Sequence, residues 1–180
     1  MKRLLGLAGL IVTLLSTSLG HAAEATVLTK MHGGNVLQAL DSAVRNDEAK
    51  ASFSDATIKI INNVTTMTVM PLENTITSLS LYPGNGKVKT IMFGIHWKKD
   101  AVDALQAVVS INSVANILGR FIRPDISKDD LAKVRKALVG ESMDALDGKE
   151  RKIRIDGTIV VSQFVDGVGF LFSIGNINEK

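Results

Sequence analysis

The residues best able to do chemistry meet near the middle of the chain, where His96, Trp97, Lys98 and Lys99 follow one another. An imidazole, an indole and two ammonium groups in a row could hold an anion or contact a partner protein. A strand end that simply reaches solvent has the same composition. These four residues are therefore a candidate contact site, and no spacing rule assigns them a reaction.

Patterns that would indicate catalysis or metal binding are missing from the sequence. The chain has no cysteine, which excludes thiol catalysis, zinc–thiolate sites and iron–sulfur clusters. Outside the first 22 residues only His32 and His96 could ligate a metal through imidazole, and they lack the spacing of a known site. No Gly-x-Ser-x-Gly motif occurs, so a hydrolase that uses His96 is kept only as an alternative. We predict no catalytic residue, no metal and no cofactor.

A second candidate surface is basic and draws on two neighbouring predicted elements. Its residues are Lys133, Lys136, Arg151, Lys152 and Arg154. Such a patch could meet an acidic partner, but an edge strand protected by charge against unwanted pairing has the same pattern. The chain also has one tryptophan and one tyrosine, too few for base stacking, so we expect no nucleic-acid partner.

A third candidate surface is a neutral polar stripe along a long predicted helix. The stripe consists of Gln106, Ser110, Ser113 and Asn116. Exposed helix faces usually carry lysine and glutamate, so a neutral stripe indicates partial burial. It could lie against the rest of the domain, which we favour because so much of this helix is apolar, or against a partner.

The first residues have the order of a secretory signal peptide. Met1–Arg3 is positively charged, residues 4–15 are almost entirely apolar, and small residues follow with cleavage positions after Ala22 or Ala25. Removal of residues 1–22 would take away Lys2 and Arg3 and lower the formal charge from +3 to +1. We therefore expect residues 23–180 to form one exported, near-neutral domain, periplasmic or secreted, with no membrane span after signal removal.

The elements that must position these candidates follow from hydrophobic periodicity. A short helix is expected over residues 36–45. Alternation and turn residues then predict strands over residues 55–60, 64–70, 75–82 and 87–97, with Pro71 ending the second. Two Asp-Gly pairs, at Asp156 and Asp166, divide the last part into three further strands over residues 150–155, 158–165 and 168–174.

A long helix over Lys99–Ile122 separates the two groups of strands. Asp100 is its expected N-cap. Its expected core stripe consists of Ala101, Leu105, Val108, Ala115, Leu118 and Ile122, flanked by Val102, Val109, Ile111, Val114 and Phe121. A shorter helix is capped by Ser127 and is expected to end near Gly140, with a further turn over residues 141–146 left open.

These observations predict an α+β domain in which two antiparallel meanders, of about four and three strands, form one curved sheet on the long helix. Export without catalytic motifs favours a binding module of the cell envelope whose partner is a protein. A carrier of a small apolar ligand is the alternative, because a helix lying across a curved sheet can leave a cavity and six methionines could line it. Oligomeric state and strand order stay open.

Overall fold

The computed structural model describes residues 32–44, 51–61, 64–72, 74–81, 86–97 and 104–175. The predicted signal peptide and its cleavage positions lie outside these ranges, as do Lys98, Lys99 and the expected cap Asp100.

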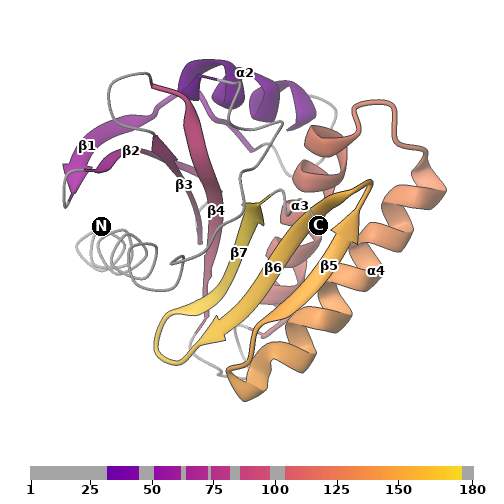
Figure 1. Cartoon of the computed structure of the whole chain (residues 1–180). Coiled ribbons are helices and arrows are strands. Elements are labelled where there is room, and N and C mark those ends of the chain that lie inside the picture. The colour runs from indigo at the N-terminus through magenta and orange to yellow at the C-terminus, as the bar shows by residue number, and fades with distance from the viewer. Residues whose placement is uncertain are drawn as a thin grey trace, which may run out of the picture.

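The predicted α+β architecture is confirmed, because all seven strands join one antiparallel sheet made of two meanders (Figure 1). The first meander comprises β1 (Thr57–Ile61), β2 (Val64–Leu72), β3 (Thr75–Leu81) and β4 (Val88–His96). The second comprises β5 (Arg151–Ile155), β6 (Thr158–Val165) and β7 (Gly169–Gly175). The strand order is β1-β2-β3-β4-β7-β6-β5, so β4 and β7 form the seam and β1 and β5 the two edges.

The described helices are α2 (Gly33–Val44), α3 (Ala104–Ile122), α4 (Lys128–Asp144) and the short 3-10 turn η2 (Ala145–Asp147). The strand register separates the two sides of the sheet. Leu79, Ile91, Ile174, Val160 and Ile153 lie in one row across five strands and belong to the same core as buried residues of the helices. We call this helix-covered side the first face and the opposite side the second face.

The second face also contains buried side chains, but of a different composition. Ile76, Met92 and Leu171 are buried there without belonging to the main core. Thr66, Ser78, Ser80 and Thr90 give the same face a group of small hydroxyl side chains across β2, β3 and β4.

Aromatic packing and a close backbone approach hold the seam between the meanders. Trp97 stacks on Phe170 with 5.4 Å between ring centroids, and Phe164 meets both rings edge-on. Gly169 begins β7 with φ +125, and a Cβ there would overlap the carbonyl oxygen of Ile95. Because L side chains rarely adopt that conformation, glycine is required at this position.

The buried face of α3 matches the prediction only in part: Ala115 and Leu118 of the expected core stripe are fully buried, but Leu105 is not. Leu105 and Val109 are 74% and 56% exposed, whereas Ile111, Val114 and Ile117 are fully buried. A helix that is apolar over most of its circumference leaves its orientation undecided, and small residues then settle it by allowing close packing. Gly119 is one of these, since a Cβ there would lie 2.7 Å from Leu131 Cδ1 on α4.

Two residues that were predicted to end an element, Gly140 and Pro71, do not end it in the structure. α4 continues through Gly140 to Asp144 and is followed by η2, so the further turn left open from the sequence is present. The left-handed residue that ends the helical segment is Gly148, with φ 82, and not Gly140. Buried Ser142 and Ala145 hold this extra turn in place, so tertiary packing overrides the glycine. β2 likewise continues past Pro71, which is tolerated because β1 pairs with β2 only as far as Thr68.

By length and hydropathy, α3 is the one helix in the described part of the chain that could cross a membrane. Half of that apolar stretch is buried inside the protein, as expected for a core helix.

Candidate interaction surface

The neighbouring residues His96 and Trp97 have different surroundings in the structure. The Trp97 ring is buried in the seam, so it belongs to the core. The His96 side chain is half-buried, and its Nδ1 donates a hydrogen bond to the Val168 carbonyl at 3.0 Å. No hydroxyl or carboxylate side chain of the described residues bonds to this imidazole, so its contacts are those of a strand end and give a hydrolytic triad no support.

Three of the four residues of the neutral stripe on α3 are used inside the domain. Ser110 and Ser113 are buried, and Ser110 Oγ donates a hydrogen bond to Asn74 Oδ1 at 2.9 Å. Asn116 is half-buried, while Gln106 remains exposed. Burial within the domain, as favoured from the sequence, therefore accounts for the stripe, with the β2–β3 turn as one neighbour.

The five basic candidates do not form one surface. On α4, Lys133 Nζ bonds to Asp130 Oδ1 at 2.8 Å, which lowers the Asp130 pKa, and Lys136 is exposed. Alternation along β5 places Lys152 and Arg154 on the second face, away from α4. Arg151 lies on the first face and is occupied by other contacts.

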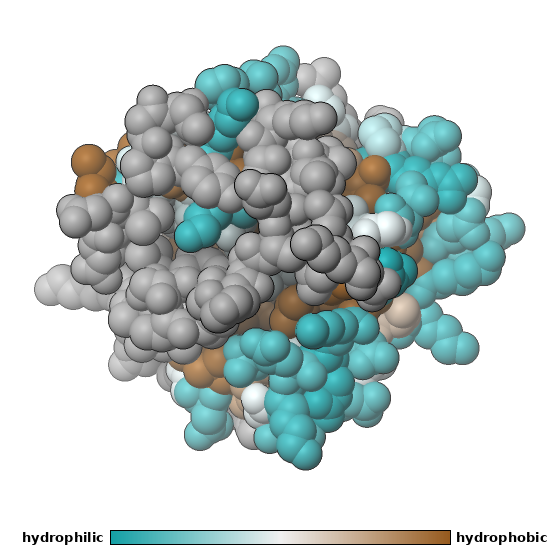
Figure 2. All heavy atoms as spheres, viewed as in Figure 1, coloured by the Kyte–Doolittle hydropathy of each residue, from teal (hydrophilic) through white to brown (hydrophobic). Residues whose placement is uncertain are grey.

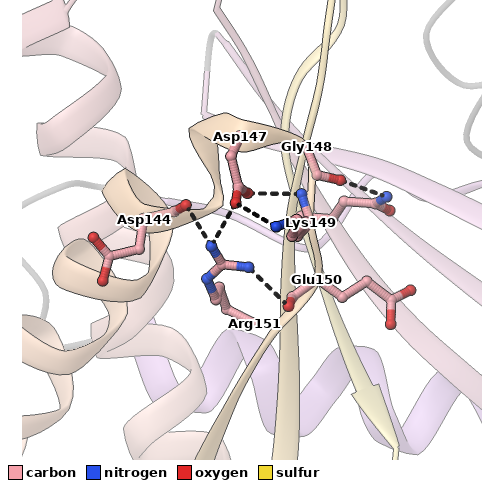
Figure 3. A network of polar contacts seen from close by, with 7 residues as sticks. Asp144, Asp147, Gly148, Lys149, Glu150 and Arg151 are labelled. Atoms are coloured by element: carbon pink, nitrogen blue, oxygen red, sulfur yellow. Dashed lines mark hydrogen bonds and ion pairs between the residues drawn. The ribbon is translucent and has the colours of Figure 1, made fainter.

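Arg151 ties β5 to the end of α4 (Figure 3). Its guanidinium donates to the Asp144 carbonyl and to Asp147 Oδ2, both at 2.9 Å, and to the Glu150 carbonyl at 3.3 Å. The pKa of Asp147 is lowered, first by the Lys149 backbone N–H at 2.9 Å and then by Arg151. This cluster, which we call the Arg151 clamp, is a structural contact that fixes one edge of the sheet.

The opposite edge, β1, presents the clearest exposed apolar surface of the described strands. Ile58 and Ile60 are 64% and 75% exposed. Both lie on the first face, because Ile58 pairs with Met67 and Ile60 with Thr65. Figure 2 shows apolar atoms at the left margin of the molecule, where Figure 1 places β1, and a hydrophilic surface on the side of α4.

These isoleucines are exposed because the helix layer stops one strand short of the edge. α2 begins over β2 and β3, where a Cβ on Gly33 would touch Met67 and Leu81. Beyond the end of β1, the Ser52 N–H bonds to the Pro71 carbonyl, so residues 51–56 continue along β2 instead of covering β1. A strand at a sheet edge also has backbone N–H and C=O groups that no neighbouring strand pairs.

Lys59 lies between the two isoleucines and points to the second face, opposite Thr66. It is exposed, and none of the seven described strands contains an aspartate or glutamate that could face it. The β1 edge therefore combines apolar groups on one face with a single cation on the other.

Two buried hydroxyl groups on the second face lack partners. Thr66 Oγ1 and Ser78 Oγ are buried and make no hydrogen bond. An unpaired buried polar group costs about 1–3 kcal/mol, and Thr77 Oγ1 on the first face and Asn116 Oδ1 on α3 are unpaired as well, so this feature is not confined to the second face.

The described residues contain no group of three or more His, Asp or Glu side chains that could hold a metal ion. The four methionines that they include do not gather in one place, since Met67 lies on the first face, Met92 lies on the second, Met70 is exposed and Met143 packs against the core from α4. Comparisons with known protein families, with curated proteins and with solved structures find no match for this chain.

Sequence reasoning predicted β1 but missed it as an interaction surface. The alternation of Thr57, Ile58, Lys59 and Ile60 gave the strand and its two faces. Nothing local shows that β1 is an edge or that the helices stop before it, because both depend on strand order. The one available signal was that this strand is short and that only one lysine interrupts its apolar residues.

Proposed function

We propose that this chain is an exported, non-enzymatic binding module of the cell envelope that takes an extended segment of a protein partner along β1. The observation that carries the proposal is the exposure of Ile58 and Ile60 on an edge strand. Adding a strand to such an edge pairs its free backbone groups and buries apolar side chains together, a common mode of peptide recognition. Export is supported by the order of charged, apolar and small residues at the start of the sequence.

A site-specific crosslinking experiment tests this proposal. A photoreactive amino acid at position 58 of the mature protein should crosslink to a partner in envelope extract. Adding Ile60→Thr to the same protein should weaken capture about tenfold, because a fully buried isoleucine contributes about 1.5–3 kcal/mol and threonine keeps the strand propensity. Val109→Gln on α3, which also removes an exposed apolar side chain, is the matched control and should leave capture unchanged. Equal capture by all three proteins would refute binding at this edge.

A second candidate function is that of a carrier for a small apolar ligand. It is favoured by Thr66 and Ser78, whose unpaired hydroxyl groups lie on the second face near buried Ile76 and Met92. Native and denaturing mass spectra of the protein from its own envelope fraction test this role. A native mass that exceeds the denatured mass by a few hundred daltons would support the carrier, and equal masses would count against it.

A further inference from the structure

The chemistry of the partner segment can be read from β1, provided that the proposed binding at this edge holds. Side chains in neighbouring strands lie opposite one another on the same face. A strand paired with β1 therefore places two alternate residues beside Ile58 and Ile60 on the first face. The residue between them lies beside Lys59 on the second face. Three consecutive residues of the partner therefore lie beside an apolar, a charged and a second apolar side chain of β1.

The electrostatic environment of Lys59 decides the charge at the middle position. Its cross-strand neighbour is Thr66, and Thr57 and Thr68 lie on the same face one pair further along. The other charged side chains of the described strands are cations too, namely Lys89 on β4 and Arg151, Lys152 and Arg154 on β5, of which Lys152 and Arg154 lie on the second face. An acidic residue opposite Lys59 would make a favourable cross-strand pair, whereas a basic one would be repelled.

The same lysine opposes pairing between two copies of this chain. In the antiparallel register that pairs all five residues of β1 with a second β1, Lys59 meets Lys59 of the other copy. Like charges placed directly opposite each other destabilise a strand pair, and an edge lysine is a common protection against self-association. The edge is therefore suited to a different sequence.

We infer that β1 selects an extended protein segment with the pattern apolar–acidic–apolar, and that Lys59 is the specificity-determining residue. Ile58 and Ile60 supply the affinity, and Lys59 supplies the preference for an acidic residue at the position opposite it.

An NMR titration with two synthetic peptides tests this inference. The peptides TVTVEVTVT and TVTVKVTVT differ only at the central residue, and binding is followed through the β1 and β2 amide signals of the mature protein. The glutamate peptide should bind the unaltered protein about fivefold more tightly, from a cross-strand charge pair of up to about 1 kcal/mol. Lys59→Glu should reverse the preference. Lys136→Glu, which changes net charge equally on exposed α4, should leave it unchanged.

The outcomes separate the inference from the function on which it rests. If both peptides shift the β1 signals equally, and Lys59→Glu changes nothing, the edge binds strands without reading charge and the inference fails alone. If neither peptide shifts these signals, binding at this edge fails and both proposals fall. If the protein forms a concentration-dependent dimer that Ile58→Thr abolishes, the edge takes a second copy and the inference is overturned.

Discussion

The two edge strands of the sheet, β1 and β5, differ in how far they are covered by helices and protected by charged side chains. At β5, α4 and η2 cover the first face, the Arg151 clamp fixes the strand to the helix end, and Lys152 and Arg154 charge the second face. At β1 no described helix covers Ile58 and Ile60, and Lys59 is the one charged residue of the strand. Edge strands are usually protected by cover, by charge or by both.

This difference places the open surface of the protein at one end of the sheet. A protein that needed only solubility would gain from charge at both edges, since exposed apolar edges invite aggregation. The two exposed isoleucines at β1, together with the protected β5, are the reason why binding is proposed at this edge. Hydrogen exchange should report the difference directly, with faster exchange of β1 amides than of β5 amides.

The largest effect on stability is expected from a substitution that disturbs the packing between the two meanders. Gly169→Ala would place a Cβ 2.6 Å from the Trp97 backbone nitrogen, at a φ that alanine rarely adopts. We expect a loss of about 3 kcal/mol or more in the free energy of unfolding, measured by urea denaturation, because backbone atoms cannot move aside as side chains can. Gly157→Ala, also at positive φ but with open space around it, is the control and should cost less. Equal losses would show that the seam is not closely packed.

A smaller effect is expected from making the β5 edge resemble β1. Arg151→Ala removes the hydrogen bonds to Asp144, Asp147 and Glu150 and should cost about 1 kcal/mol. The β5 amides should then exchange nearly as fast as the β1 amides, while β1 itself is unchanged. Unaltered exchange at β5 would mean that packing against α4, and not the clamp, secures this edge.

The smallest effect that we expect is a change in stability at low pH. The Asp147 pKa is lowered in the folded protein, so its charged form stabilises the fold at neutral pH, and this contribution is lost as pH falls below about 4 toward the folded-state pKa. Asp147→Asn should slightly lower the unfolding temperature at pH 7 and have less effect at pH 2.5. Thermal denaturation at the two pH values measures this. An equal loss at both would show that the carboxylate charge is unimportant.

The fold could be predicted from the sequence because its signals are local. The alternating strands, the Asp-Gly turns and the Ser127 cap, whose Oγ accepts the Asp130 N–H at 3.1 Å, are each decided within a few residues. The orientation of α3 could not be predicted, since an almost entirely apolar helix offers several equivalent faces. Packing against α2, α4 and β4 distinguishes them, and the close approach of α4 at Gly119 is one of these contacts.

The candidate site was harder to predict than the fold for the same physical reason. Trp97 and Arg151 looked available as sequence neighbours of charged residues, but tertiary packing uses one in the seam and the other in the clamp. Ile58 and Ile60 were predicted only as part of an alternating strand, and strand order leaves them exposed. Whether a side chain is free to bind depends on the whole sheet, which no short window of sequence contains.

The strand order has a consequence for the order of events during folding. The first meander is contiguous in sequence, so its hairpins can close quickly. The edge of β4 that faces away from β3 can pair only when β7 has been added, as in the pair Ile91 and Ile174. Contacts between residues so far apart in sequence form slowly because the intervening chain must be ordered first. Until β7 pairs with β4, Phe93 and Ile95 lie on an incomplete sheet whose two edges, β1 and β4, both lack a partner strand. In the folded sheet β4 is paired, and β1 is the edge that no described helix or charge cluster protects. Chaperone dependence should therefore be greatest before residues 169–175 are available to pair.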